Sequence, residues 1–386
     1  MIIVSALDNS GQAHAADLVR ALRTRLPHEQ FVGVGGKDLA AAGCQLVHDI
    51  SETSAMLTGV VAATSWAIPL YRELIRRMAH DDVKLVILVD SPTFNLPLAK
   101  AAKKRGIKTL YYIAPQVWAW AKFRVRRVRK RVDRLAVILP FEEPFFREHG
   151  IDATFVGHPF IHRVRQTPID PHLSAELDSL PGPRILLMPG SRRGVVDQLL
   201  PVQLRLLQRL FDRFPSASAQ IAAWPGLTAE IAHQVDKSGL DVSLRKLSTA
   251  PHSVSVLDEH RATLIARTDL ALVASGTATL EVAWHGRPMI VMYNASKLMY
   301  HAVARWLIRT KHLSLINILA QQHVVPEFMP YIRDENEVFD TAASLLADPA
   351  KAEQLGRQLR QTLAPLETDR DPADKTADLA LDLINR

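Results

Sequence analysis

Short apolar runs alternate along the chain with segments of helical hydrophobic spacing. In the first half, apolar runs predict strands at residues 1–6, 31–36, 83–90, 108–115, 134–140 and 154–159. After a loop rich in proline, aspartate and serine, further runs predict strands at residues 184–190, 219–225, 254–257, 269–276 and 289–293. These runs are continuous, which is typical of strands covered on both faces of a parallel sheet. The pattern predicts an α/β protein with two doubly wound sheets.

The boundary between the two predicted sheets falls near residue 165, in the polar loop. We therefore predict a Rossmann-like domain at 1–165 and a second at 166–348. Residues 349–386 show a polar helical pattern, and we expect this tail to pack back on one of the domains, by hypothesis the N-terminal one.

Composition narrows the class of protein. A chain of 386 residues that is 48% hydrophobic can fill sizeable cores, which excludes a disordered or fibrous protein. The single cysteine, Cys44, excludes an intramolecular disulfide framework, and we expect its thiol to be buried rather than reactive. A formal charge of +7 favours an anionic partner, which is a nucleotide, a nucleic acid or an anionic bilayer.

Two turns in the second half have the composition of a phosphate site. In LLMPGSRRGVVDQLLP, Pro189 and Gly190 follow a predicted strand, Ser191 is expected to cap the next helix, and Arg192 and Arg193 add positive charge. In LVASGTATLEVAW, small hydroxyl residues separate a strand from a helix. Unpaired N–H groups at helix N-termini attract phosphate. An ordinary strand-to-helix turn is the alternative for each motif alone, and the pairing of the two favours a diphosphate site.

Longer motifs carry a resemblance to a known family. They run almost end to end and are SGQAHAADLVRAL, FVGVGG, VDSPTFNLPLAK, YYIAPQVWAW, ILPFEEPFF, FVGHP, MPGSR, SGTATLE and INILAQQHVVPEF. In these motifs the chain resembles the lipid-A-disaccharide synthases. The resemblance implies a GT-B fold, with two Rossmann-like domains facing a cleft. It also implies an inverting glycosyltransferase of lipid A biosynthesis, which moves 2,3-diacylglucosamine from its UDP carrier to 2,3-diacylglucosamine 1-phosphate.

The resemblance also suggests site residues. Asp90, at the end of a predicted strand, is the expected general base, with His14 and Asp8 as the next candidates and a turn cap as its alternative role. Glu281 is expected to hold the ribose hydroxyls, or else to satisfy its own helix turn. The other expected substrate-binding residues are Ser10, Gly11, Asn95, Gly190, Ser191, Arg192, Ser275, Gly276, Thr277, Thr279, Asn317 and Glu327.

No metal site and no cofactor is expected, because the sequence has no DxD-like pair at a strand end and no His-Cys cluster. Several polar positions of the family motifs are changed. Gln12, Thr93 and Val195 stand where the family has acids, and Ile316 and Pro330 replace a proline and a glutamine. These changes leave open a divergent paralogue with another UDP-sugar or acceptor, or a non-catalytic nucleotide-sugar-binding protein.

The segment AKFRVRRVRKRVDRL predicts a basic helix, with Val125, Val128, Val132 and Leu135 on one face and the cations on the others. A solvated face is the common role of such a helix. Together with the apolar residues 55–70, it favours docking on an anionic membrane surface, here the inner face of the cytoplasmic membrane. No signal peptide or transmembrane helix is expected, nucleic acid is not an expected partner, and the sequence is compatible with a homodimer.

Overall fold

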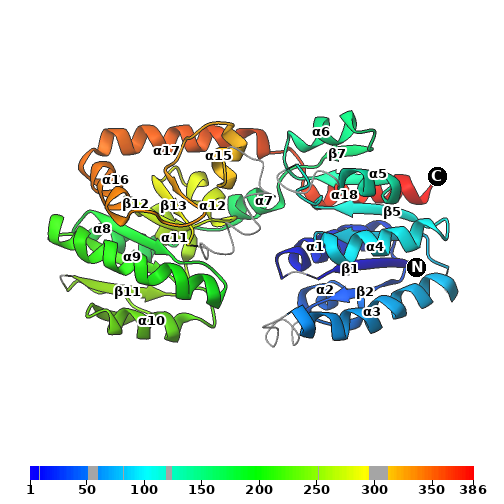
Figure 1. The fold of residues 1–386 in the computed structure, drawn as a ribbon, viewed down its shortest axis with the longest axis horizontal. Helices are drawn as coiled ribbons and strands as arrows, with labels where there is room; N and C mark the ends of the chain where they lie inside the picture. The colour runs from blue at the N-terminus through cyan, green and yellow to red at the C-terminus, as the bar shows by residue number, and fades with distance from the viewer. Residues whose placement is uncertain (8, 51–59, 81, 119–123, 251, 295–311) are drawn as a thin grey trace. The chain divides into compact units, whose positions relative to one another are not determined.

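The computed structural model describes the chain except for residues 8, 51–59, 81, 119–123, 251 and 295–311. The chain divides into two compact units (Figure 1). Unit 1 comprises Met1–His162 and Leu366–Arg386, and unit 2 comprises Arg163–Pro365. Each unit is built around its own parallel sheet.

The sheet of unit 1 has seven described strands in the order β3-β2-β1-β4-β5-β6-β7. Their bounds are β1 Ile2–Ala6, β2 Phe31–Gly35, β3 Gln45–Asp49, β4 Leu85–Val89, β5 Lys108–Tyr112, β6 Arg134–Val137 and β7 Ala153–Phe155. The central strands β1 and β4 are wholly buried, because helices cover both faces of the sheet. Their continuous apolar runs follow from this burial.

Two layers of helices enclose the sheet of unit 1 (Figure 1). On one face, α1 (Asn9–Arg25) packs against α2 (Lys37–Ala41) and α18 (Pro372–Ile384). On the other face, α4 (Pro92–Lys103) lies between α3 (Val60–His80) and α5 (Val125–Arg131). Side chains of β1 alternate between the two cores, with Ile2 and Val4 on the α1 side and Ile3 on the α4 side. The short helices α6 (Glu142–Glu148) and α7 (Pro159–Gln166) flank β7.

The sheet of unit 2 also has seven described strands, in the order β10-β11-β9-β8-β12-β13-β14. Their bounds are β8 Arg184–Met188, β9 Ser218–Ala222, β10 Asp241–Leu244, β11 Ser253–Leu257, β12 Leu270–Ala274, β13 Met289–Met292 and β14 Glu327–Phe328. The helices are α8 Pro171–Ser179, α9 Arg193–Arg213, α10 Thr228–Lys237, α11 Arg261–Ala266, α12 Ala278–Trp284, α15 Leu315–Ala320, α16 Glu335–Ala347 and α17 Pro349–Leu363. One core lies among the sheet, α9, α10 and α16.

The structure confirms the two doubly wound parallel sheets and adds three strands that the apolar runs do not predict. These strands, β3, β10 and β14, all lie at sheet edges. They are half-buried or exposed, so they lack the continuous apolar run of an interior strand.

Two further details differ from the sequence prediction. The basic helix α5 ends at Arg131, and Leu135 belongs to β6 instead of the helix face. The C-terminal tail is shared between the units, because α17 packs against α12, α15 and α16 in unit 2 whereas α18 packs against α1 in unit 1.

Cys44 is buried as predicted, and burial raises the pKa of its thiol to about 12. Among the described residues, no helix is long and apolar enough to cross a membrane.

Candidate active site

The first group of expected site residues lies where the strand order of unit 1 reverses. Strands β1 and β4 are neighbours, with Ala6 opposite Val89. The chain leaves β1 toward β2 on one side and leaves β4 toward β5 on the other, so the loops after β1 and β4 diverge. Ligands of open α/β sheets bind at such a switch point, at the carboxyl ends of the strands. Asp90 directly follows β4 there.

The backbone at Asp90 is strained and firmly held. Asp90 and Ser91 both have left-handed conformations, with φ of 49° and 44°. Such conformations cost free energy for residues other than glycine and persist only where neighbours enforce them. The Asp90 carbonyl accepts hydrogen bonds from Asn95 Nδ2 (2.8 Å) and Tyr111 Oη (2.5 Å), and its N–H donates to the Tyr112 carbonyl (3.2 Å). These hydrogen bonds therefore fix the backbone position from which the Asp90 side chain extends.

Asn95 is part of this support. Its side chain is fully buried, and Nδ2 also donates to the Val89 carbonyl (3.0 Å). Its Oδ1 accepts a hydrogen bond from Ser5 Oγ of β1 (2.7 Å). The sequence suggested Asn95 as a substrate ligand. That contact stays a prediction, and in the structure the Asn95 amide joins β1, β4 and the Asp90 turn.

The start of α1 approaches the same turn. A Cβ atom placed on Gly11 would lie 3.8 Å from Asp90 Cβ, so Gly11 borders the expected base. His14, one turn later, is half-buried. Asp8 lies outside the described residues, and for Ser10 only its position in the first turn of α1 is described.

His158, in the FVGHP motif, is a neighbour of this region to which the sequence assigned no role. Its side chain is 4% exposed, and its pKa falls to about 3 because burial disfavours the charged ring, with a smaller contribution from positive charge on His14. His158 is therefore a neutral imidazole at physiological pH. A histidine next to a glycine-proline turn gives no sequence signal for such burial.

The second group of site residues lies at the switch point of unit 2, between β8 and β12. These strands pair with Met188 opposite Val273, so the turns that follow them are neighbours. Gly190 has φ of +116°, and a Cβ there would come within 3.1 Å of Val195 Cγ1 and 3.5 Å of Ala274 Cβ. Glycine is favoured because the positive φ strains any other residue and Val195 leaves little room for a Cβ, while Ala274 at the end of β12 is in ordinary contact. The two glycine turns predicted from the sequence thus form one surface.

The cations of the first turn differ in their surroundings. Helix α9 begins at Arg193 with Arg192 as its N-cap, so Ser191 does not cap the helix as the sequence suggested. Arg193 forms an ion pair with Glu230 of α10, with 2.6 Å between Nη2 and Oε2. Arg192 is exposed, and its guanidinium has no partner among the residues that the structure describes. With Ser191, also exposed, it is available to an incoming anion at the start of α9.

In the second turn, three of the four expected substrate-binding residues are at least partly accessible to solvent. Gly276 and Thr277 are exposed, Ser275 is half-buried, and a Cβ on Gly276 would meet no atom within 4 Å. Thr279 is different, because its side chain is fully buried and its hydroxyl donates to the Gly276 carbonyl (2.8 Å). Thr279 therefore supports the turn, and its contact with a ligand stays a prediction.

Glu281 lies in the first turn of α12 and is 8% exposed. Burial raises the pKa of its carboxyl group, against the opposing effect of the Arg261 guanidinium. Arg261 Nε lies 2.8 Å from Glu281 Oε2, which makes Arg261 a site residue that the sequence did not indicate. Arg261 comes from the start of α11, far from SGTATLE in the sequence, so only the fold brings them together.

Asn317 and Glu327 form a second internal network. Asn317 Oδ1 accepts from the backbone N–H groups of Val324 (2.8 Å) and Val325 (2.9 Å), and Nδ2 donates to the Val325 carbonyl (2.9 Å) and to Glu327 Oε2 (3.0 Å). Asn317 is fully buried, so its hydrogen bonds hold the loop between α15 and β14. The expected contact of Asn317 with substrate stays a prediction.

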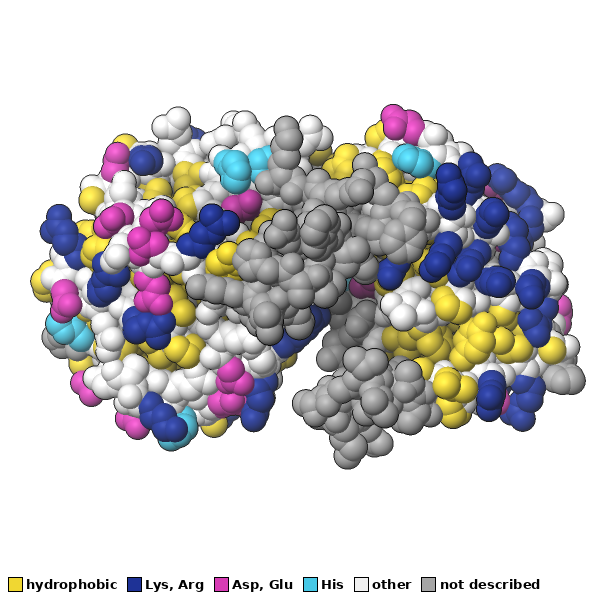
Figure 2. Space-filling model, viewed as in Figure 1, with side chains coloured by type: hydrophobic (Ala, Val, Ile, Leu, Met, Phe, Trp, Pro, Cys, Tyr) yellow, Lys and Arg dark blue, Asp and Glu magenta, His cyan; other side chains and the backbone are white. Residues whose placement is uncertain are grey.

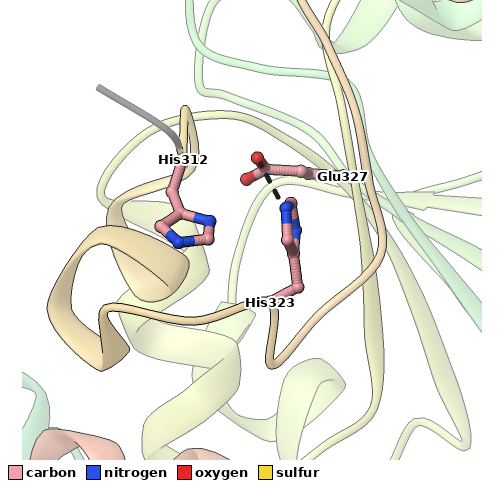
Figure 3. A group of neighbouring side chains, drawn as sticks. All are labelled: His312, His323 and Glu327. Carbon is pink, nitrogen blue, oxygen red and sulfur yellow. Dashed lines mark ion pairs between the residues drawn. The ribbon is translucent and has the colours of Figure 1, made fainter. Parts of the chain in front are cut away.

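Glu327 is held by the protein as well. Burial alone would raise the pKa of its carboxyl group, but hydrogen bonds from Ser314, Asn317 and Leu313 outweigh burial and lower it. The carboxylate lies near His312 and His323 (Figure 3). The sequence analysis missed this cluster, although the spacing of His323 and Glu327 in HVVPE was a usable signal.

A cavity of about 430 Å³ in unit 2 is not part of this site. It is lined by Pro183, Asp269, Arg287 and Pro288, among others. These residues precede β8, β12 and β13, at the amino ends of the strands. The glycine turns lie at the carboxyl ends, on the opposite edge of the sheet.

Comparisons with known proteins agree on the family. The model of the lipid-A-disaccharide synthetase family matches residues 2–378. The chain belongs to this family. It is 35% identical to the lipid-A-disaccharide synthase of Syntrophus aciditrophicus, over 100% of this chain and 98% of the relative. It is 34% identical to the synthase of Geobacter sulfurreducens, over 100% of this chain and 97% of the relative. Membership makes the protein a glycosyltransferase of lipid A synthesis.

Solved structures support the fold assignment. MnaA of S. aureus, solved together with UDP, is similar with a TM-score of 0.65 and 13% identity, over 100% of this chain and 98% of that one. A UDP-N-acetylglucosamine 2-epimerase of Listeria monocytogenes has a TM-score of 0.60 and 12% identity, over 100% of this chain and 95% of that one. The two parallel sheets with flanking helices have the GT-B fold.

The positions at which this chain departs from the family motifs differ in burial. Gln12 is buried in α1, whereas Thr93 is exposed in the first turn of α4. Val195 packs against Gly190, and Ile316 is fully buried. Asp197, two residues beyond Val195, is exposed and accepts a hydrogen bond from Gln234 of α10 (3.1 Å).

Proposed function

We propose that the chain is an inverting glycosyltransferase that moves 2,3-diacylglucosamine from UDP to 2,3-diacylglucosamine 1-phosphate. The observation that carries the proposal is the pair of neighbouring glycine turns at the switch point of unit 2, in a chain of the lipid-A-disaccharide synthetase family. In this proposal unit 2 binds the UDP donor. Unit 1 binds the acceptor and faces the membrane.

The donor diphosphate rests on the turn after β8. Gly190 allows the backbone to approach the phosphate closely, and the Ser191 hydroxyl donates a hydrogen bond to it. The unpaired backbone N–H groups at the start of α9 and the positive charge of Arg192 also attract phosphate. Ser275, Gly276 and Thr277 line the neighbouring turn. These contacts strengthen as negative charge builds on the departing UDP, which is the condition for faster transfer.

Glu281 and Arg261 are placed to act together on the ribose. Arg261 occupies one carboxylate oxygen of Glu281, Oε2, and the other oxygen remains for a ribose hydroxyl. The ion pair also opposes the effect of burial, which raises the pKa of the Glu281 carboxyl group.

Asp90 is the proposed general base. It accepts the proton of the attacking acceptor hydroxyl while the new glycosidic bond forms and UDP leaves from the opposite face of the sugar. The strained turn supports this role, because Asn95, Tyr111 and Tyr112 hold its backbone in one position. His14, half-buried in α1, and Asp8 are the alternative bases.

Unit 1 also carries a surface suited to an anionic bilayer. Helix α5 exposes Arg126, Arg129 and Lys130, and α3 exposes Ile68 (52%). Helix α4 lies between them, so all three elements cover the same face of the sheet. Figure 2 shows Lys and Arg side chains gathered over the region of α4 and α5, beside an apolar band. Cations attract anionic headgroups, and apolar side chains enter the bilayer.

The direct test of the reaction is incubation of the purified chain with UDP-2,3-diacylglucosamine and 2,3-diacylglucosamine 1-phosphate. We expect UDP and a disaccharide 1-phosphate in equal amounts, with the anomeric configuration of the transferred sugar inverted in the NMR spectrum. Failure of turnover while UDP still binds would reject this acceptor and lead to a screen of other UDP-sugars and acceptors. A product with retained configuration would reject the single-displacement mechanism.

The membrane proposal is tested by sedimentation with vesicles that contain anionic lipid. Charge reversal at Arg126 and Arg129 should release the protein from these vesicles at physiological salt, whereas the matched change at Lys351, an exposed cation of α17 in unit 2, should not. Equal binding of both variants would place the membrane contact elsewhere.

A further inference from the structure

Two histidines and a glutamate of unit 2 converge beside its edge strand. His312 precedes α15, whereas His323 and Glu327 follow it, with Glu327 starting β14. One nitrogen or oxygen atom from each residue lies within 4.8 Å of the other two. Figure 3 shows both imidazole rings and the carboxylate facing a common space. Imidazole and carboxylate are the ligands of catalytic-type zinc sites with a His₂Glu donor set.

The carboxylate is oriented in advance. Glu327 Oε1 accepts from the N–H of Leu313 (3.2 Å), and Oε2 accepts from the N–H of Ser314 (2.9 Å) and from Asn317 Nδ2 (3.0 Å). Oε1 lies 4.0 Å from His323 Nδ1, an ion-pair distance that is too long for a hydrogen bond. Donors that fix a ligand from behind are characteristic of metal sites, because they hold the carboxylate in its binding orientation.

The histidines supply the other two donors. His312 Nδ1 is buried and has no hydrogen-bond partner within the described part of the chain. Buried polar atoms nearly always have a bonding partner, so we expect one for His312 Nδ1. His323 has a side chain that is 65% exposed, and its ring lies edge-on to that of His312, with 4.5 Å between the ring centroids.

We propose that His312, His323 and Glu327 bind one divalent transition-metal ion of the zinc class. Zinc bonds of about 2.0–2.1 Å in tetrahedral geometry place ligand atoms about 3.4 Å apart, so the cluster must contract by about 1 to 1.5 Å. The exposed ring of His323 can make this movement, while Glu327 stays fixed. Two nitrogen donors disfavour Mg²⁺ and Ca²⁺, which prefer oxygen ligands.

The ion closes the loop that contains α15. His312 stands at one end of this loop and His323 and Glu327 at the other, so a metal that bonds to all three joins the two ends, and water fills its fourth position. The proposed function assigns no role to these three residues, so this inference does not depend on it.

The test is titration of the full chain, free of any polyhistidine tag and stripped of metal, with Zn²⁺ by calorimetry and with Co²⁺ by visible absorption. We expect one ion per chain and tetrahedral Co²⁺ bands. His312→Gln and His323→Gln should each weaken Zn²⁺ binding at least tenfold. The control His233→Gln, at an exposed position of α10, should bind as the unaltered chain does.

A second measurement guards against misfolded variants. Zn²⁺ should raise the thermal midpoint of the unaltered chain and of His233→Gln, but not that of His323→Gln, whose midpoint without metal should equal that of the unaltered chain because its ring is exposed. The proposal is overturned if the unaltered chain does not bind Zn²⁺ at micromolar concentration, or if both cluster variants bind it as well as the control.

Discussion

At the scale of single residues, the site combines groups that the protein has already satisfied with groups that it leaves available. Thr279 and Asn317 are buried and bonded internally. Arg192 is exposed, and its guanidinium has no partner in the described structure, whereas its neighbour Arg193 is paired with Glu230. A side chain such as Arg192, which has no described partner and lies beside a well-ordered turn, is accessible to a substrate.

This contrast between adjacent arginines makes a matched test. Arg192→Ala should weaken binding of the UDP donor roughly 10- to 150-fold and slow turnover, because charge-assisted bonds worth about 1.5–3 kcal/mol are lost. Arg193→Ala removes a surface ion pair worth at most about 1 kcal/mol and should change donor affinity far less. Inhibition constants for UDP provide the measurement. Equal effects of the two substitutions would contradict the assignment of Arg192.

Asp90 permits a second test at this scale. Asp90→Asn should reduce turnover by about 10²- to 10⁴-fold, since the amide cannot accept the proton. Asparagine tolerates the left-handed conformation, so unfolding free energy should change by less than about 1 kcal/mol and UDP should bind normally. Steady-state kinetics and urea denaturation measure both quantities, with Asp38→Asn on the exposed side of α2 as control. Near-normal turnover would transfer the role of base to His14 or Asp8.

At the scale of elements, the Asp90 turn depends on packing between elements that are distant in sequence. Asn95 of α4 and Tyr111 of β5 bond to the backbone at the end of β4, and Ser5 of β1 bonds to the Asn95 side chain. The turn is therefore positioned by three neighbouring elements at once. Strain of this kind is retained at sites where geometry matters more than local stability.

Truncation of the Asn95 side chain tests whether it holds the Asp90 turn in place. Asn95→Ala should lower the free energy of unfolding by about 1–3 kcal/mol, because the Ser5 hydroxyl and the Val89 carbonyl lose buried partners. It should also lower kcat while UDP, bound in the other unit, keeps its affinity. Lys100→Ala, an exposed change in the same helix, is the control for stability. Unchanged kcat in a destabilised Asn95 variant would show that the turn tolerates movement.

At the scale of the whole molecule, the chain returns to its first unit at the end. Helix α18 completes the core beside α1, with Ala377 and Ala380 fully buried. Arg25 of α1 pairs with Asp374 (2.8 Å) and Asp378 (3.0 Å) of α18. The core of unit 1 therefore includes residues 366–386.

A charge in this interface should act on one unit. Ala377→Asp should lower the stability of unit 1 by several kcal/mol, because a carboxylate is buried without a partner. Hydrogen exchange followed by mass spectrometry should show lost protection in β1, β4 and α1, with unit 2 peptides unchanged. Asn385→Asp, exposed at the end of α18, serves as control. Loss of protection in both units to the same extent would mean that they unfold together.

The sequence by itself determined the two doubly wound sheets, the family and the two glycine turns. Interior strands such as β1 and β12 are buried on both faces, so they must be apolar throughout, and the turns require glycine at Gly190 whatever surrounds them. Local pattern is sufficient for such features because each residue meets a uniform environment.

Only the tertiary structure decided three of the four edge strands, β3, β10 and β14, and the roles of individual polar residues. Edge strands such as β3 are half exposed and leave no apolar run. Ser5 and Asn95 bond across 90 positions of sequence, and His312 meets Glu327 only because the loop around α15 folds back. Whether a polar side chain supports the fold or awaits a ligand depends on which partners the fold brings within hydrogen-bond distance, and spacing along the chain does not contain that information.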